Sequence, residues 1–162
     1  MHDRGGTCKR SGGDIGLMNT PRLLSVGIKD VDFGSNVTVV DPVNLYGCAI
    51  GDDCFIGPFV EIQKDVVLGK RCRIQSHSFI CELVTIGDDC FISHGVMFIN
   101  DKFTEGRKEW LSRKTIVGPR VRIGSNSTIL PVIIGHDAVI GAGSVVTKNV
   151  PPGAIVKGNP AQ

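Results

Sequence analysis

The stretch IGDDCFIGPFVEIQKDVVLGKRCRIQSHSFICELVTIGDDCFISHGVMF occupies residues 50–98, and it places a large apolar residue at every sixth position. The series is Ile50, Ile56, Ile62, Leu68, Ile74, Ile80, Ile86, Ile92 and Phe98. In an amphipathic helix, apolar residues return after three or four positions, so a period of six does not fit a helix. The period fits short strands joined by tight corners, with three hexads of sequence forming one triangular coil of a solenoid.

The same period extends on both sides of this stretch. Upstream it includes Val31, Val37 and Val43, and downstream it resumes at Val117, Ile123 and Ile129, shortens by one residue, and continues through Ile134, Ile140 and Val146. We therefore predict an all-β fold, a parallel β-helix of about six coils over residues 31–160. Residues 1–30 form a tail or an N-terminal cap in this interpretation.

Two further positions of the hexad have a consistent composition. The second is often glycine, which allows either a positive φ or a close approach of neighbouring backbone. The fifth is small or β-branched, and Cys54, Cys72 and Cys90 occupy it at intervals of one coil. We expect these cysteines to stack in one inward column as small apolar side chains. A metal site is the weaker alternative, because the three thiols would be spread along about 10 Å of the axis.

The composition excludes several classes of protein. Hydrophobic residues reach 41% although aromatic residues are only 6%, and glycine contributes 21 of 162 residues, which argues against both disorder and a helical bundle. A net charge of +2 predicts no nucleic-acid partner. No apolar run approaches the roughly 20 residues of a membrane span, and the polar N-terminus does not resemble a secretory signal. Six cysteines without such a signal favour a reducing, cytoplasmic compartment.

One segment interrupts the repeat. Between Phe98 and Val117 the chain contains one hexad and a 13-residue insertion, which predicts a loop over residues 101–115. The loop is rich in basic residues and contains the single tryptophan: Lys102, Arg107, Lys108, Trp110, Arg113 and Lys114. It is either an ordinary solvated loop or a flap that reaches a neighbouring subunit and meets substrate phosphates.

Two stretches carry a family resemblance, IQSHSFICELVTIGDDCFISHGVMFINDKF at 74–103 and VVTKNVPPGAIVKGNPA at 145–161. With the hexad repeat, they make the chain similar to the hexapeptide-repeat acyltransferases. Within that family it most resembles the enzymes that N-acetylate amino groups of nucleotide-linked deoxysugars. The resemblance implies the left-handed form of the β-helix, a homotrimer with active sites between adjacent prisms, and acetyl-CoA as donor.

The resemblance also suggests which chemistry to expect. Related O-acetyltransferases use a loop histidine to deprotonate a hydroxyl, but FINDKFTEGRKEWLSRKT (98–115) contains none. An amine with a pKa near 8 needs no strong base, because a useful neutral fraction exists at pH 7. By resemblance, Asn100 orients the acceptor amine and the departing CoA sulfur takes the proton. We expect Asn100 and His77 to be the catalytic residues, with His77 accepting the proton or orienting the sugar.

Other residues are expected to bind the two substrates. Glu82 precedes Asn100 by 18 residues, hence by one coil, and it is grouped with the other expected acceptor-binding residues His94, Asp101, Lys102 and Arg107. By resemblance, CoA lies along the C-terminal coils, and its expected contacts are Gly118, Gly141, Ala142, Gly143, Lys148, Ala154, Lys157 and Pro160. For Gly141 the repeat by itself is a sufficient explanation.

The predicted function is therefore transfer of an acetyl group from acetyl-CoA to an amino group of a nucleotide-linked deoxysugar. An alternative is O-acetylation of a sugar or of serine, with His77 or His94 as the base. Two further alternatives are a non-catalytic assembly subunit and a metalloenzyme of the γ-carbonic-anhydrase type. No metal site is predicted, because His77 and His94 are 17 residues apart and no close histidine pair exists.

Overall fold

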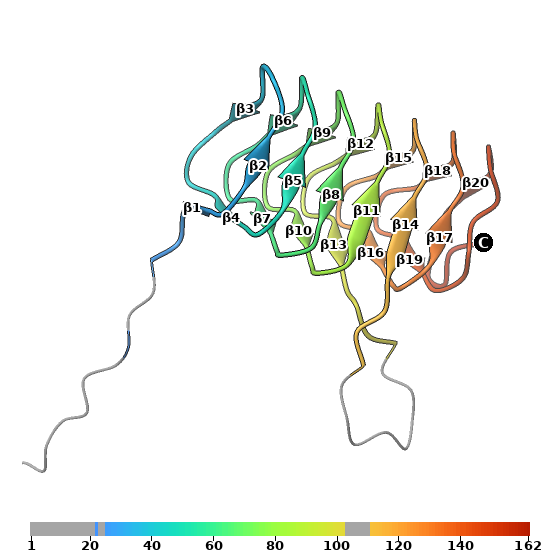
Figure 1. Cartoon of the computed structure of the whole chain (residues 1–162). Coiled ribbons are helices and arrows are strands. Elements are labelled where there is room, and N and C mark those ends of the chain that lie inside the picture. Colours follow the sequence, from blue (N-terminus) through green and yellow to red (C-terminus); the bar gives the residue numbers. More distant parts are fainter. Residues whose placement is uncertain (1–21, 23–24, 103–110) are drawn as a thin grey trace, which may run out of the picture.

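The structure is a computed structural model that describes residue 22, residues 25–102 and residues 111–162. Within these residues every regular element is a short strand, and the strands form three parallel sheets along one prism (Figure 1). Sheet A contains β1 (Ile28–Lys29), β4 (Asn44–Tyr46), β7 (Glu61–Ile62), β10 (Phe79–Ile80), β13 (Met97–Phe98), β16 (Thr128–Ile129) and β19 (Val145–Val146). Sheet B contains β2 (Asp32–Phe33), β5 (Ala49–Ile50), β8 (Val67–Leu68), β11 (Val84–Ile86), β14 (Thr115–Val117) and β17 (Ile133–Ile134). Sheet C contains β3 (Thr38–Val39), β6 (Phe55–Ile56), β9 (Arg73–Ile74), β12 (Phe91–Ile92), β15 (Arg122–Ile123), β18 (Val139–Ile140) and β20 (Ile155–Val156).

The chain visits the sheets in the order A, B, C, so each turn has an A–B, a B–C and a C–A corner. This confirms the predicted parallel β-helix, and the arrangement is consistent with the left-handed form. The sheets have seven, six and seven strands, so the coil completes about seven turns rather than the six predicted. The described residues include no helix long and apolar enough to cross a membrane.

The interior consists of stacked columns of apolar side chains. Ile56, Ile74 and Ile92 are register partners in sheet C, and each is 0% exposed. The upstream valines are shifted relative to the expected column. Thr38 pairs with Phe55, which aligns Val37 with Cys54 instead of with an isoleucine. Val31, Val37 and Val43 therefore continue the columns of small residues, because β2, β3 and β4 pair with the next turn at an offset of 17 residues.

The cysteine column is confirmed. Cys54, Cys72 and Cys90 are buried at successive turns, and the backbone N–H of Cys72 donates to Cys54 Sγ at 3.3 Å. Each thiol also donates to a carbonyl oxygen of the turn that follows it, at 3.1 Å in all three cases. These contacts explain why a small residue with a weak donor fits this column.

The glycines at the second hexad position serve close packing of the backbone. A Cβ added to Gly51 would lie 2.6 Å from the carbonyl oxygen of Gly69 in the next turn. Positive φ values occur instead at the fourth position, for example at Asp53 (φ 58) and Asp89 (φ 60). Of the two roles that glycine can have in the hexad, the close approach is the one that applies at Gly51.

Thr115 leads to a prediction about stability. Its Oγ1 is buried and has no hydrogen-bond partner among the described residues, and it lies in the small-residue column between Val84 and Val132. Replacing Thr115 with valine keeps the shape of the side chain and removes the unsatisfied hydroxyl. We therefore expect the free energy of unfolding to rise by about 1 kcal/mol. Urea unfolding measures this. Ser127→Ala is the matched control, because Ser127 Oγ donates to Gly124 O at 2.8 Å and its loss should destabilise.

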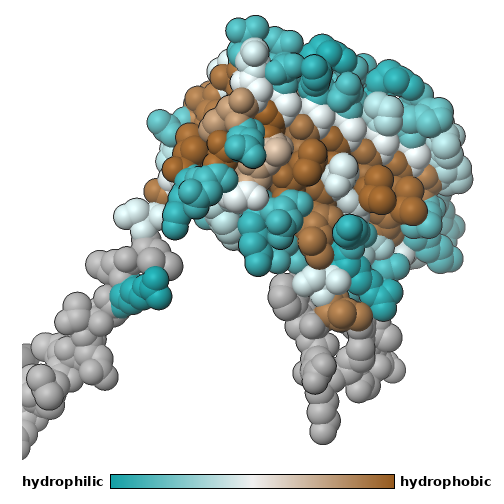
Figure 2. Space-filling model, viewed as in Figure 1, coloured by the Kyte–Doolittle hydropathy of each residue, from teal (hydrophilic) through white to brown (hydrophobic). Residues whose placement is uncertain are grey.

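The B–C corners carry a ladder of exposed ion pairs. Arg71 contacts Asp89 through two nitrogens at 2.7 and 2.9 Å, and Arg120 contacts Asp137 in the same way at 2.6 and 2.8 Å. Hydrophilic residues accordingly line one long edge of the prism in Figure 2. The Arg120 guanidinium, and after it His136, hold the pKa of Asp137 well below its usual range.

A second prediction concerns acid stability. Because the folded state lowers the pKa of Asp137, its stabilising contribution is present above the unfolded pKa of about 3.9 and is lost as the pH falls below it. Asp137→Asn should therefore have a lower Tm at pH 7 and lose less Tm than the parent between pH 7 and pH 2.5. Asp65→Asn is the control, because Asp65 has no ion pair within the described residues. Equal Tm losses in the parent and Asp137→Asn would contradict the prediction.

The predicted loop leaves the prism between β13 and β14 (Figure 1). Val84 pairs with Thr115 at an offset of 31 residues, 13 more than the offset of 18 between β8 and β11 in the preceding turn. The backbone N–H of Arg113 donates to the carbonyl oxygen of Asn100 at 2.7 Å. This bond ties the two ends of the loop together at the A–B corner.

Candidate active site

A hollow of about 390 Å³ lies where the loop leaves sheet A, and we call it the Asn100 pocket. Asn100 and Asp101 follow β13 directly, and Glu82 follows β10 one turn earlier. Asn100 is 9% exposed and Asp101 is 7% exposed, whereas Glu82 is half-buried. The complete lining is Gln63, Phe79, Cys81, Glu82, Ile99, Asn100 and Asp101. The structure therefore brings together three of the residues that the sequence analysis assigned to the site.

The charges around Glu82 involve residues from earlier turns. Lys64 Nζ lies 3.6 Å from Glu82 Oε1, and Gln63 Nε2 donates to Glu61 Oε1 at 2.9 Å. Partial burial, followed by the negative charges of Glu61 and Glu82, raises the pKa of Tyr46, so its hydroxyl remains protonated and can donate. Sequence reasoning missed these residues. Counting 18 residues back from Glu82 identifies Lys64, so the repeat itself contained the signal.

Cys81 forms part of the pocket wall. Burial, together with the negative charge of Glu82, raises the pKa of its thiol to about 12. Because the thiolate is the reactive form of cysteine, this side chain is an apolar wall and not a nucleophile at neutral pH.

The two histidines lie at a different corner from Asn100. His77 and His94 are exposed on successive turns of the C–A corner, whereas Asn100 is on the A–B corner. Glu82 follows His77 by five positions along the coil, which corresponds to about 16 Å of extended chain. The His94 ring is held by Ser76, with Oγ 2.9 Å from Nδ1, and the His77 ring stacks on Phe59 with centroids 4.8 Å apart. Within one chain, the structure does not bring either histidine to the Asn100 pocket.

The remaining expected acceptor contacts belong to the loop. Lys102 is exposed and follows Asp101 directly. Arg107, Lys108 and Trp110 lie outside the described residues, as does the tail up to residue 21. The structure thus describes the two ends of the predicted flap, residues 101–102 and 111–115, and of these Asp101 lines the Asn100 pocket.

The residues expected to bind CoA lie on all three corners. Gly141, Ala142 and Gly143 form a C–A corner, and Lys157 stands beside Gly141 in the next turn, since a Cβ on Gly141 would lie 2.8 Å from Lys157 Cβ. Lys148 is at an A–B corner and Gly118 at a B–C corner. Ala154 follows Ala138 in the small-residue column and is half-buried, and Pro160 is exposed near the C-terminus. Of the expected CoA contacts, the structure thus places Gly141, Gly143 and Lys157 at the same corner in successive turns.

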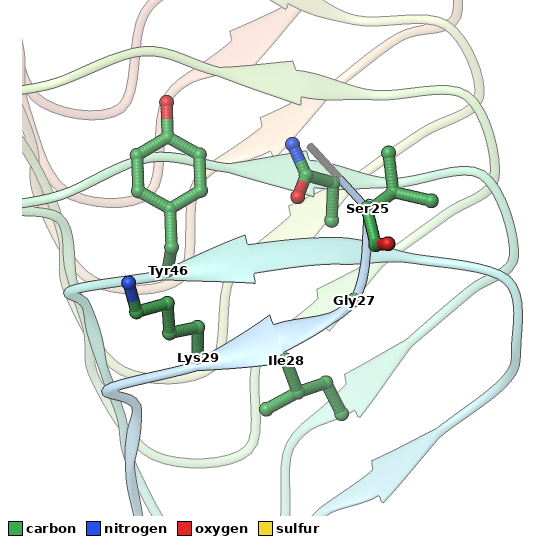
Figure 3. A pocket seen from close by; sticks show the side chains of 7 residues that line it. Ser25, Gly27, Ile28, Lys29 and Tyr46 are labelled. Atoms are coloured by element: carbon green, nitrogen blue, oxygen red, sulfur yellow. The ribbon is translucent and has the colours of Figure 1, made fainter. Parts of the chain in front are cut away.

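A separate hollow of about 660 Å³ lies at the N-terminal end of sheet A (Figure 3). Its lining is Ser25, Val26, Gly27, Ile28, Lys29, Asn44 and Tyr46. In Figure 3 the Tyr46 ring and the Lys29 side chain stand on the same side of β1 and β4. This hollow contains none of the residues that the sequence predicted for catalysis. We therefore place the candidate active site at the smaller Asn100 pocket, where buried polar groups converge.

Among the residues that the structure describes, no group of three or more histidine, cysteine, aspartate or glutamate side chains is arranged to hold a metal ion.

Two family models match the repeat. Bacterial transferase hexapeptide (six repeats) matches residues 47–82, which end at Glu82, and the hexapeptide repeat of succinyl-transferase matches residues 114–148. The chain is also similar to the bifunctional protein GlmU of Synechococcus sp. (strain RCC307), at 30% identity over 148 residues, covering 83% of this chain and 32% of that protein. The chain thus spans about a third of the length of the curated relatives that it matches.

Solved structures with the same coil include acetyltransferases. A hexapeptide-repeat-containing acetyltransferase, VCA0836 of Vibrio cholerae O1 biovar eltor, solved in complex with acetyl coenzyme A, has a TM-score of 0.66 and 27% identity over 72% of this chain and 68% of its own. The polySia-specific acetyltransferase NeuO has a TM-score of 0.54 and 26% identity, covering 82% of this chain and 68% of its own. The β-helix, the hexads and these matches agree that the chain is built from the transferase hexapeptide repeat and is similar to acetyltransferases that share it.

Proposed function

We propose that this protein transfers an acetyl group from acetyl-CoA to an amino group of a nucleotide-linked deoxysugar. The observation that carries the proposal is the Asn100 pocket, in which a nearly buried amide lies beside Asp101 and Glu82. The three described histidines of the coil, His77, His94 and His136, lie at other corners. The acetyl-CoA complex of the similar Vibrio cholerae protein supports the donor, and the sugar specificity of NeuO supports a carbohydrate acceptor.

The pocket suits an amine better than a hydroxyl. A sugar amine with a pKa near 8 is partly neutral at pH 7 and can attack a thioester without a dedicated base. In the proposed step, Asn100 accepts a hydrogen bond from the amine N–H and so directs the lone pair at the carbonyl carbon. The C–N bond forms, the C–S bond breaks, and the amine proton passes to the CoA sulfur. Backbone N–H groups along the cleft stabilise the negative charge that develops on the carbonyl oxygen.

The other residues around the pocket bind and orient the substrates in this proposal. Glu82, whose carboxylate is oriented by Lys64, accepts hydrogen bonds from a sugar hydroxyl. Lys102 and Arg107 bind the diphosphate of the nucleotide. CoA lies along Gly141–Gly143, with Lys157 near its phosphates. The buried free cysteines are compatible with a reducing compartment, and we place the reaction in the cytoplasm.

We further propose that the protein acts as a homotrimer, in which clefts between chains complete the site. Sheet B offers a surface for such contacts, because Val67, Ile116 and Ile133 on its outer face are 47%, 44% and 52% exposed. Apolar surface extends along this face in Figure 2. Contiguous exposed apolar surface of this kind is typical of protein–protein contacts.

O-acetylation remains the second candidate, and the His94–Ser76 contact favours it. In the tautomer in which His94 Nδ1–H donates to Ser76 Oγ, the unprotonated Nε2 atom can act as a base toward a hydroxyl. If a neighbouring chain presents this corner to the Asn100 pocket, a hydroxyl acceptor becomes feasible. Under this mechanism His94→Ala would lower turnover by about 100-fold or more.

The test is an acceptor panel. The protein is incubated with acetyl-CoA and a set of nucleotide-linked amino sugars, plain sugars and serine, and both free thiol and acetylated product are measured. We expect turnover with an amino sugar and little effect of His77→Ala or His94→Ala. Turnover with hydroxyl acceptors alone, lost in His94→Ala, would establish the second candidate instead. Absence of both turnover and acetyl-CoA binding would indicate a non-catalytic subunit.

A further inference from the structure

The outer face of sheet C carries an alternating column of aromatic and cationic side chains. Phe55, Arg73, Phe91 and Arg122 begin β6, β9, β12 and β15, and each is the register partner of the next. These four strands lie side by side in successive turns (Figure 1). Because neighbouring strands are about 4.8 Å apart, two aromatic rings and two guanidinium groups occupy about 15 Å of one face.

The two arginines of this column have positive charges that the described part of the chain does not neutralise. Arg73 Cζ lies 5.0 Å from the centroid of the Phe55 ring, a stacked position in which the N–H edges of the guanidinium remain available. No carboxylate in residues 25–102 or 111–162 forms an ion pair with Arg73 or Arg122. Arg71, at the adjacent corner, differs because both of its forked nitrogens contact Asp89.

These groups surround a hollow of about 300 Å³. Its lining is Arg71, Arg73, Asp89, Cys90, Phe91 and Arg122. Three arginines against one aspartate give the lining a formal charge of +2, which a phosphate group with two negative charges balances. Phe91 is 38% exposed between the two free guanidinium groups, so it offers a flat apolar surface beside the charge.

We propose that this hollow is a nucleotide-phosphate site, in which Arg73 and Arg122 bind the phosphate and Phe91 stacks against the base. Guanidinium groups suit phosphate because their N–H pairs match two of its oxygens, and base stacking on an aromatic ring accepts any base. None of the residues that line this hollow is among those assigned above to acetyl transfer. It lies on sheet C, whereas the Asn100 pocket lies at the corner between sheets A and B.

The test is titration of the intact protein with ADP, UDP, adenosine and inorganic phosphate. Calorimetry gives the affinities, and the changes in amide NMR chemical shifts on adding each ligand locate the site. We expect ADP and UDP to bind more tightly than either adenosine or phosphate, with shifts at Phe91 and Arg122. Arg73→Met and Arg122→Met should each weaken ADP binding about tenfold. Lys29→Met, which lowers the net charge equally but lies in β1 of sheet A, should leave ADP binding unchanged.

Three results would overturn the proposal. The first is ADP binding that is the same in the parent and in Arg122→Met. The second is phosphate binding as tight as ADP binding, which would remove the role of Phe91. The third is that ADP changes the amide chemical shift of Asn100 and leaves that of Phe91 unchanged. If Arg73→Met fails to fold, Arg73→Lys, which keeps the charge but loses the paired N–H geometry, provides the same comparison.

CoA also carries an adenosine phosphate, so the titration is repeated with saturating acetyl-CoA. Displacement of ADP would identify the nucleotide end of CoA as the occupant of the hollow. Simultaneous binding of ADP and acetyl-CoA would identify a separate nucleotide. Both results support a nucleotide-phosphate site on sheet C and distinguish its source.

Discussion

Asn100→Ala is expected to lower kcat/KM for acetyl transfer by about 100-fold, with most of the loss in kcat. The proposed role of the amide is to orient the acceptor amine toward the thioester, and loss of orientation costs about this much in rate. The substitution should leave the fold intact, because the bond that closes the loop uses the backbone carbonyl of Asn100 and not its side chain. Initial rates of thiol release over a range of acceptor concentrations measure the effect.

Two controls accompany this variant. Thr128→Ala, on the same sheet but outside the pocket lining, should retain full activity. Asn100→Asp keeps the size and the acceptor oxygen of the side chain, so it should recover part of the lost rate if the amide accepts a hydrogen bond from the amine. An Asn100→Ala protein with parental Tm and undiminished acetyl transfer would remove the main support of the proposed mechanism.

Gly124→Ala is expected to destabilise the coil by about 3 kcal/mol. A Cβ at this position would lie 2.5 Å from the backbone nitrogen of Ala142 and 2.7 Å from its Cα. Both atoms belong to the backbone of the next turn, so no side-chain rotation relieves the contact and the two turns must separate. The midpoint of urea unfolding and the Tm measure the loss.

Gly143→Asn is the matched control for this variant. Gly143 has φ +67 and nothing lies within 4 Å of an added Cβ, so it differs from Gly124 in having space but a left-handed backbone. Asparagine tolerates that conformation, as Asn126 does in the preceding turn, and we expect less than about 1 kcal/mol of change. If both variants were equally destabilised, close backbone packing would not be the reason for the second-position glycines.

The repeat predicted the core because each hexad carries its own apolar residues, whose side chains point inward in every turn. The period identified Ile56, Ile74 and Ile92 as one column and Cys54, Cys72 and Cys90 as another, and the structure confirms both. The assignment of the upstream valines was wrong for a specific reason. In a strand, residues two apart point to the same side, so both Val37 and Val39 are apolar and point inward. Only the pairing of Val39 with Ile56 shows which of the two continues the isoleucine column.

The candidate site was predicted in part. Spacing alone places Glu82 one turn below Asn100, and both line one pocket in the structure. The same spacing places Lys64 one turn below Glu82, and the two side chains form an ion pair. The sequence analysis did not identify Lys64, because it lies outside the stretches that carry the family resemblance. His77 and His94 were expected near Asn100 because they flank the coil that carries the loop. The fold separates them by a strand of sheet A, so they lie at a different corner of the prism.

By itself, the sequence determined the β-helix, its columns and the position of the inserted loop, because each of these depends on a repeat whose contacts are always one turn away. The tertiary structure decided what no period encodes, namely which side chains share a corner or an outer face. Asn100 with Asp101 and Glu82, and Arg73 with Phe91 and Arg122, become neighbours only when the turns are stacked in register. The physical reason is that a hexad specifies the inward side chains through burial, whereas the outward ones are constrained only by their neighbours in other turns.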